Sequence, residues 1–209
     1  MKVINSSVQL LFPHNFLEIQ EMLLNIELAT RTCYKSENKI KDVPDIDFIM
    51  DKVKKGHLSV IEHGFVTVKI ICDRGISHEI VRHRIASYSQ ESTRYCNYAK
   101  DKFNNEITFI KPNYLKEGTI DYLIWEKAMQ EAELAYFNLL SLGKTPQEAR
   151  AVLPNSLKTE IVMTANFREW RHFLTLRLSK QAHIQMQEIA KMILIKLQKI
   201  PKIFDDFEY

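Results

Sequence analysis

The sequence predicts a single α+β domain over residues 1–209, without a Rossmann unit. Segments with strand and helix patterns are interspersed along the chain without a regular βαβ repeat. With only five glycines, the chain contains neither a G-x-G-x-x-G nor a G-x-x-x-x-G-K-[ST] loop. An apolar content of 45% is enough for one sizeable core in a chain of 209 residues. We therefore expect side chains and helix ends to hold any ligand that bears phosphate.

The first half of the chain alternates between the two patterns. Strands are expected at residues 3–12 and 65–72, and helices at residues 15–32, 43–56 and 74–84. Asn15 is suited to cap the first helix, whose apolar residues follow helical spacing. Gly56 is suited to end the second. In FVTVKIIC, branched and aromatic residues alternate with others, as in a strand.

The second half contains the longest helical patterns. Strands are expected at residues 106–112 and 158–166, and helices at residues 119–143, 145–154, 166–177 and 180–200. Gly143 is placed to end the first of these helices. Thr145, Pro146 and Glu148 form the pattern of a capping box with proline at the first helical position. These local signals predict where each helix begins or ends.

Composition narrows the function classes. The chain has 29 basic and 26 acidic residues, and its net charge of +3 is far from the surplus of a protein that coats nucleic acid. Cys33, Cys72 and Cys96 are widely spaced and include no C-x-x-C pair, which favours a reduced setting. The first residues do not resemble a signal peptide, and no apolar run reaches membrane-spanning length. We expect a cytoplasmic protein that binds neither nucleic acid nor membranes.

The segment RHRIASYSQESTRY, residues 82–95, concentrates cationic and hydroxyl side chains. On a helix over residues 74–84, Arg82 and Arg84 would point about 200° apart and serve different surfaces. After them come short hydrogen-bonding residues and Arg94, whose forked guanidinium suits phosphate. Taken alone, the two first arginines could also form a solvated basic helix end.

Two histidines in HLSVIEHGF, His57 and His63, lie six residues apart, with Glu62 beside the second. A zinc helix of the H-E-x-x-H type places both histidines on one face, and this spacing does not, so we expect no metal site. A loop that faces a ligand is one interpretation. Two ordinary histidines near a helix end are the other.

The helix expected at residues 166–177 has two faces. Asn166, Trp170, Phe173 and Arg177 share one stripe. On the opposite side lie Arg168 and His172. An apolar stripe that ends in an arginine suggests a site, although the head of Arg177 could instead reach the last carbonyls of its own helix. Arg150 could likewise be a plain surface cation.

Several ordered motifs resemble those of the flavin-dependent thymidylate synthases. RHR followed by seven residues and serine occurs as RHR IASYSQE S, residues 82–92. H-x-x-x-x-E-H precedes this signature, and A-R-x-V-L-P and N-x-R-x-x-x-x-F-L-x-L-R follow it, ending at Arg177. The family order is kept over nearly the whole chain. Together these motifs are far more specific than the signature alone.

The resemblance implies the reaction and its partners. We expect reductive methylation of deoxyuridine monophosphate (dUMP) to thymidine monophosphate (dTMP), with methylenetetrahydrofolate giving the carbon, FAD carrying the hydride and NADPH as reductant. The family fold is α+β, with long helices around a mixed sheet. Its members are homotetramers with sites shared between subunits.

The same resemblance implies the site residues. The expected flavin contacts are Ser59, Arg82, His83, Arg84, Gln90, Asn166, Arg168 and His172. The expected nucleotide contacts are Glu79, Arg82, Gln90, Glu91, Ser92, Thr93, Arg94, Arg150 and Arg177. Arg177 is expected to be catalytic, by favouring ionisation of the uracil ring nitrogen at position 3. Some family members have glutamate in place of Gln90 and asparagine in place of His172.

Two other function classes compete with this prediction. The conventional thymidylate synthase uses a cysteine preceded by proline, whereas Thr32, Ile71 and Tyr95 precede the three cysteines here. A non-enzymatic binder of nucleic acid or nucleotides could use the basic segment as a clamp, but the near-neutral charge argues against nucleic acid. Ser92 has no neighbouring histidine in sequence, so we expect it to bind phosphate and not to act as a nucleophile.

Overall fold

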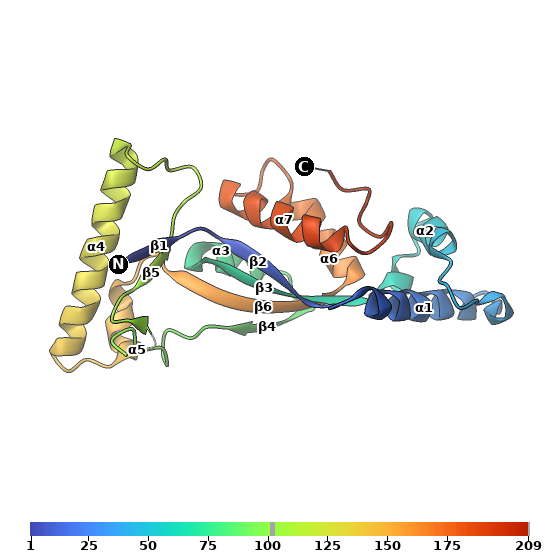
Figure 1. The fold of residues 1–209 in the computed structure, drawn as a ribbon, viewed down its shortest axis with the longest axis horizontal. Helices are drawn as coiled ribbons and strands as arrows, with labels where there is room; N and C mark the ends of the chain where they lie inside the picture. The colour runs from blue at the N-terminus through green and yellow to red at the C-terminus, as the bar shows by residue number, and fades with distance from the viewer. Residues whose placement is uncertain (101–102, 209) are drawn as a thin grey trace. The chain divides into compact units, whose positions relative to one another are not determined.

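The computed structural model describes residues 1–100 and 103–208 and confirms the α+β fold (Figure 1). The strands are β1 (Lys2–Ile4), β2 (Ser7–Phe12), β3 (Phe65–Asp73), β4 (Ala86–Gln90), β5 (Thr108–Ile110) and β6 (Lys158–Asn166). The α-helices are α1 (Phe16–Thr32), α2 (Ile46–Lys54), α3 (Arg74–Ile80), α4 (Ile120–Ser141), α5 (Pro146–Ala149), α6 (Phe167–Arg177) and α7 (Ile184–Leu197). Short 3-10 helices include η1 (Glu37–Lys39), η2 (Leu58–His63) and η4 (Arg150–Val152). None of the helices in the described part of the chain has the length and apolar character needed to span a membrane.

The strands form two sheets. One has four strands in the order β2-β3-β6-β4, and the other pairs β1 with β5 in parallel. In the smaller sheet, Lys2 lies opposite Thr108 and Ile4 lies opposite Ile110. Strands β2 and β3 are consecutive in the chain, whereas the pairs β3-β6, β6-β4 and β1-β5 are not, so most of the pairing in the sheets is long-range.

The chain divides into two compact units, each assembled from separate stretches of sequence. Unit 1 contains Met1–Ser7, Ile70–Arg82 and Ser89–Ile161. Unit 2 contains Val8–Lys69, His83–Tyr88 and Val162–Tyr209. The single domain expected over residues 1–209 stays a prediction.

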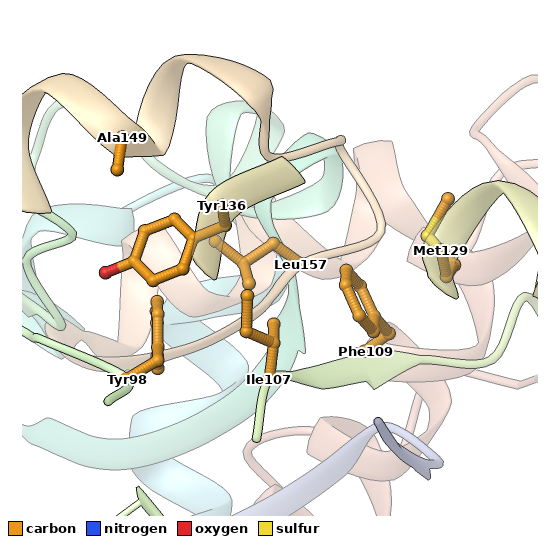
Figure 2. Packing of buried hydrophobic residues seen from close by; sticks show 7 residues of the cluster. All are labelled: Tyr98, Ile107, Phe109, Met129, Tyr136, Ala149 and Leu157. Atoms are coloured by element: carbon orange, nitrogen blue, oxygen red, sulfur yellow. The ribbon is translucent and has the colours of Figure 1, made fainter. Parts of the chain in front are cut away.

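The core of unit 1 is built around α4 and β5 (Figure 2). Met129 and Tyr136 of α4 belong to one buried cluster with Phe109 of β5 and Leu157. The ring of Tyr136 is fully buried and lies edge-on to the ring of Tyr98, with centroids 5.6 Å apart. Burial of each large side chain of this kind contributes about 1.5–3 kcal/mol. The long helix is therefore held by its inward face, as amphipathic helices are.

The core of unit 2 is aromatic and centres on α6. Phe167, Trp170 and Phe173 are fully buried, as is Phe204 near the end of the chain. Phe167 N donates to the carbonyl of Gly64 at 2.9 Å, which fixes the first turn of α6 against the start of β3. The indole Nε1 of Trp170 donates to the carbonyl of Val66 at 3.1 Å. These contacts confirm that the Trp170 and Phe173 stripe faces inward.

The expected helix boundaries are confirmed at several caps. Asn15 Oδ1 accepts a hydrogen bond from Glu18 N at 3.0 Å at the start of α1. Thr145 and Glu148 form the capping box that opens α5, with proline in the first turn. Gly143, which follows α4, has φ +85°, a left-handed conformation that favours glycine.

Three expected boundaries are wrong. Helix α3 ends at Ile80, so Arg82 and Arg84 lie in the connection to β4. The two arginines are not on a helix, and the expected angle of about 200° between them does not apply. Strand β4 was missed because its sequence, ASYSQ, is polar, although Ala86, Tyr88 and Gln90 alternate with exposed serines. Pairing of β4 beside β6 supplies the backbone hydrogen bonds that make this polar segment a strand.

The other two differences lie near the chain ends. The strand expected at residues 3–12 is divided into β1 and β2, which belong to different sheets. The helix expected at residues 180–200 begins only at Ile184, where His183 Nδ1 accepts a hydrogen bond from Gln185 N at 3.3 Å. No local sequence pattern indicates that a strand will change sheets, as at residues 3–12. None indicates that a histidine will cap a helix, as His183 does.

Close packing at Gly64 gives a test of the unit 2 core. A Cβ at this position would lie 2.6 Å from Phe167 Cε2 and 2.8 Å from Ile26 Cδ1, both in buried side chains. Gly64→Ala should therefore lower the free energy of unfolding by about 1–3 kcal/mol, as overpacking does. As a control, Asn25→Ala on the exposed face of α1 should change it by less than about 0.5 kcal/mol. Urea denaturation measures both, and a neutral Gly64→Ala would contradict this packing.

Candidate functional site

A buried histidine, His83, is the centre of the candidate site in unit 2. Its Nδ1 lies 3.0 Å from Glu169 Oε1, and its Nε2 accepts a hydrogen bond from Arg177 Nε at 3.1 Å. His83 is 4% exposed and Glu169 is 7% exposed. The rings of Phe173 and His172 lie beside the imidazole, with centroids 4.8 and 5.6 Å away. Both ring nitrogens of His83 thus have partners on α6.

Helical spacing brings these partners together. Glu169, Phe173 and Arg177 follow one another at intervals of four residues, so they share a face of α6. Asn166 sets the start of the helix, because its Oδ1 accepts a hydrogen bond from Glu169 N at 2.8 Å. One capped helix therefore holds a carboxylate, an aromatic ring and a guanidinium in order along His83.

The two hydrogen bonds define the protonation state of His83. An arginine Nε–H can only donate, so Nε2 of the imidazole must be the acceptor and Nδ1 carries the proton that is donated to Glu169. Burial lowers the pKa of His83 from its ordinary value of 6.5, the hydrogen bond to Glu169 opposes this shift, and the charge of Arg177 adds to it. A neutral imidazole can accept from Arg177, and an imidazolium cannot.

A cavity of about 620 Å³ lies along α6 in the same unit. Its lining residues are Leu58, Glu62, Ile85, Asn166, Arg168, Glu169, Arg171, His172, Thr175 and Phe207. The expected flavin residues Asn166, Arg168 and His172 are therefore brought together at one cavity. Two others, Ser59 and Arg84, are exposed and do not line it, although their neighbours Leu58 and Ile85 do.

The arginines of this cavity are held by ion pairs. Arg168 Nη1 lies 2.6 Å from Glu62 Oε1, with both side chains about half exposed. Arg171 Nη1 lies 2.7 Å from Asp206 Oδ1. The exposed Arg168–Glu62 pair contributes about 0–1 kcal/mol, so an anionic ligand can compete for the Arg168 guanidinium. The Arg171 side chain is only 17% exposed and is held more firmly by both carboxylate oxygens of Asp206. The donor set, two arginines with a histidine and an asparagine, fits a ligand that carries phosphate.

His83, Glu169 and His172 also have the side chains of a metal site, with possible ligand atoms within 4.8 Å of one another. Both nitrogens of His83 are already used in hydrogen bonds to Glu169 and Arg177. A cation here would also meet the charge of the Arg177 guanidinium. We therefore assign hydrogen bonding, not metal binding, to this group.

A second group of expected site residues lies in unit 1. Arg150 Nη1 donates to Thr93 Oγ1 at 3.0 Å, and Arg94 Nε donates to Gln147 Oε1 at 2.8 Å. These bonds join the segment after β4 to α5 and η4. Ser92 takes part as well, because its Oγ accepts from Arg94 N at 3.3 Å. Two arginines and two hydroxyl residues are thereby tied to the same part of unit 1, and both kinds of group suit a phosphate.

Side-chain contacts with α3 and β6 fix the residues at the end of β4. Gln90 Nε2 donates to Ser77 Oγ at 2.9 Å and to Thr159 Oγ1 at 3.2 Å. Glu91 Oε2 lies 3.1 Å from Lys158 Nζ. Glu79 lies on α3, and Arg82 lies exposed just after it. Gln90 and Arg82 thus belong to unit 1, whereas the cavity-lining flavin residues belong to unit 2.

Three residues with clear contacts were not expected from the sequence. Glu169 holds His83, Gln147 holds Arg94, and Lys158 holds Glu91. Asn-Phe-Arg-Glu at residues 166–169 has the spacing of a helix start, so Glu169 was visible as an acidic residue of the first turn. Nothing in the sequence indicates that its carboxylate turns inward, because its partner is 86 residues away.

Comparison with known families agrees with the resemblance of the motifs. The family model described as "Thymidylate synthase complementing protein" matches residues 18–201. The flavin-dependent thymidylate synthase of Corynebacterium glutamicum is 34% identical over 205 residues, covering 88% of this chain and 78% of that relative. That of Pyrococcus furiosus is 39% identical over 145 residues, or 69% of this chain. The chain covers 59% of the length of this archaeal relative.

Solved structures share the fold. A UMP/dUMP methylase, PolB from Streptomyces cacaoi, determined with 5-Br dUMP, superposes with a TM-score of 0.77 at 21% identity, covering 98% of this chain and 95% of that one. Thymidylate synthase X from Helicobacter pylori, determined with FAD and dUMP, superposes with a TM-score of 0.71 at 22% identity, covering 96% and 98%. Since the family model matches most of the residues and relatives above 30% identity extend over most of the sequence, the chain belongs to the family of flavin-dependent thymidylate synthases.

Proposed function

We propose that this chain is a flavin-dependent thymidylate synthase, which methylates dUMP to dTMP with methylenetetrahydrofolate as carbon donor and NADPH as reductant. The observation that carries the proposal is the α6 site, where Asn166, Arg168 and His172 line one cavity and Arg177 is held by buried His83. The membership of the family supports it. The reaction is inferred from the names of the relatives, and the site contains side chains that suit this reaction.

In this proposal the cavity of unit 2 holds FAD, which supplies hydride transfer when bound. Arg168 would bind the diphosphate in place of its exposed partner Glu62. His172 and Asn166 would add hydrogen bonds, and the apolar residues Leu58 and Ile85 of the lining suit a flat ring. Contacts from Ser59, Arg82, His83, Arg84 and Gln90 remain part of the proposal.

The phosphate of dUMP would be bound by the unit 1 group. Arg94 and Arg150 supply forked donors, and Ser92 and Thr93 supply hydroxyls. Glu79, Arg82, Gln90 and Glu91 are proposed to contribute to the same nucleotide site. We further propose a cytoplasmic homotetramer whose active sites take residues from several subunits, with no nucleic acid as partner.

Arg177 is proposed as the catalytic residue. Its permanent positive charge would stabilise the negative charge that develops on the uracil ring when the nitrogen at position 3 ionises. The ionised ring is more nucleophilic at carbon 5, so methylation needs no covalent bond to the protein. Because Arg177 is half-buried, its charge acts over a lower effective dielectric than at an exposed position.

Flavin content tests the proposal most simply. The purified protein should be yellow, with a flavin spectrum that bleaches when NADPH is added without oxygen. Arg168→Ala should raise the FAD dissociation constant about tenfold or more, because a charge-assisted bond contributes about 1.5–3 kcal/mol. The control Lys199→Ala removes an exposed cation beyond α7 and should leave FAD binding unchanged. A folded wild-type protein without affinity for FAD would refute the proposal.

Turnover tests the role of Arg177. Arg177→Ala should lower kcat about a hundredfold, as the loss of a preorganised electrostatic donor does, at roughly 3 kcal/mol. Arg177→Lys keeps the charge without the fork, so it should recover part of the loss. Rates are compared at equal flavin content and equal Tm. Near wild-type methylation by a folded, yellow Arg177→Ala protein would remove this residue from the mechanism.

The cysteines should be dispensable for turnover. Cys72 is buried in β3, and burial raises the pKa of its thiol to about 12, which disfavours the nucleophilic thiolate. Cys33 and Cys96 belong to neither residue group described above, and neither forms a disulfide within the described part of the chain. A variant with all three cysteines replaced by alanine or serine should keep kcat within about tenfold, provided that its Tm shows a folded protein. Complete loss of activity in a folded variant would favour a cysteine mechanism.

A further inference from the structure

We infer that Glu169 is a positioning residue for Arg177, which acts through His83 by fixing the imidazole tautomer that Arg177 needs. The chain of contacts runs from Glu169 Oε1 to His83 Nδ1 at 3.0 Å, and from His83 Nε2 to Arg177 Nε at 3.1 Å. The catalytic consequence rests on the proposed function. The tautomer itself does not depend on it.

Glu169 determines which nitrogen of His83 carries the proton. An ionised carboxylate only accepts hydrogen bonds, so the imidazole must present an N–H at Nδ1. The carboxylate is itself immobile, since Glu169 is buried at the first turn of α6 and its N–H is bonded to Asn166 Oδ1. The backbone at His83 is fixed as well, because Tyr88 Oη donates to the His83 carbonyl at 2.6 Å.

The tautomer in turn determines how Arg177 is held. With the proton on Nδ1, Nε2 is an acceptor for the Arg177 Nε–H. With the proton on Nε2, two donors would face each other and the hydrogen bond would be lost. The bond at Nε fixes the plane of the guanidinium. The terminal nitrogens Nη1 and Nη2 are then the groups of Arg177 that would contact substrate. Small errors in the position of a catalytic group can lower rates by about a hundredfold.

A purely structural role for Glu169 predicts different behaviour. In that case the carboxylate would only interact favourably with the N-terminus of α6, as an acidic residue in a first turn does. The chain contains a matched example, because Asn15 and Glu18 occupy the same positions at the start of α1, with Asn15 Oδ1 bonded to Glu18 N at 3.0 Å. Glu18→Ala therefore controls for the loss of a first-turn acid.

The test compares Glu169→Ala, Glu169→Gln and Glu18→Ala with the wild type. Nitrogen-15 NMR of histidine-labelled protein without flavin or substrate reports the tautomer of His83. The wild type should show the proton on Nδ1, and Glu169→Ala should populate both tautomers. Glu169→Gln keeps an oxygen acceptor and should keep the wild-type tautomer, as should Glu18→Ala. Should Glu169→Ala fail to fold, the Gln variant and a second variant, Glu169→Asp, which withdraws the carboxylate by one methylene, provide the comparison.

Kinetics then connect the tautomer with turnover. Glu169→Ala should lower kcat roughly tenfold to a hundredfold at normal flavin content and little changed KM for dUMP, and Glu169→Gln should recover most of this loss. The inference would be overturned if His83 stayed protonated on Nδ1 in Glu169→Ala. It would also be overturned if Glu18→Ala lost as much kcat and Tm as Glu169→Ala. If the wild type forms no dTMP, the proposed function fails, and the NMR comparison still decides whether Glu169 sets the tautomer.

Discussion

The first turn of α6 is the constraint on which the candidate site depends. Asn166 caps this helix through Glu169 N, and Phe167 N is bonded to the carbonyl of Gly64. These two bonds fix where the helix begins and therefore which residues face inward. Given that start, Glu169, Phe173 and Arg177 must lie along His83, and Arg168 and His172 must face the cavity. A shift by one residue would rotate each of them by about 100° and dismantle the site.

The proposed function requires two anionic ligands, and this chain has no glycine-rich loop with which to bind them. In place of such a loop, each of the two units contains arginines that suit an anionic ligand. Unit 1 brings Arg94 and Arg150 together with two hydroxyls, and unit 2 places Arg168 at a cavity. The guanidinium groups are kept in position by Gln147, Thr93 and Glu62, which are weak partners that a phosphate can replace. Arg177 differs from them because the neutral imidazole that accepts its Nε–H is buried.

Much of the fold could be predicted from the sequence because its signals are local. The caps at Asn15 and Thr145 and the strand pattern of β6 each occupy a few consecutive residues. The end of α3 could not be predicted, since it depends on pairing of the polar strand β4 in the sheet. The inward face of α6 was predicted from its stripe, and the contact of Arg177 with His83, 94 residues earlier, was not. Helical spacing indicates which residues share a face, but it carries no information about the partner.

The motif order predicts the chemistry, whereas the structure shows which further residues hold the predicted site residues in place. Glu169 and Gln147 are not in the motif positions that were assigned roles, and both hold residues that were. Support of this kind is invisible in a single sequence because it depends on distances between separate segments. It is also the part of the site that decides how accurately a guanidinium is placed.

The central claim is that this site transfers a carbon to dUMP by way of bound flavin. The most direct measurement is the fate of a carbon-13 label in the methylene group of methylenetetrahydrofolate, with wild-type protein, dUMP and NADPH. Label should appear in the methyl group of dTMP, formed only by protein that carries FAD. Folded, flavin-loaded protein that leaves dUMP unlabelled, or label transfer that proceeds equally without flavin, would contradict it.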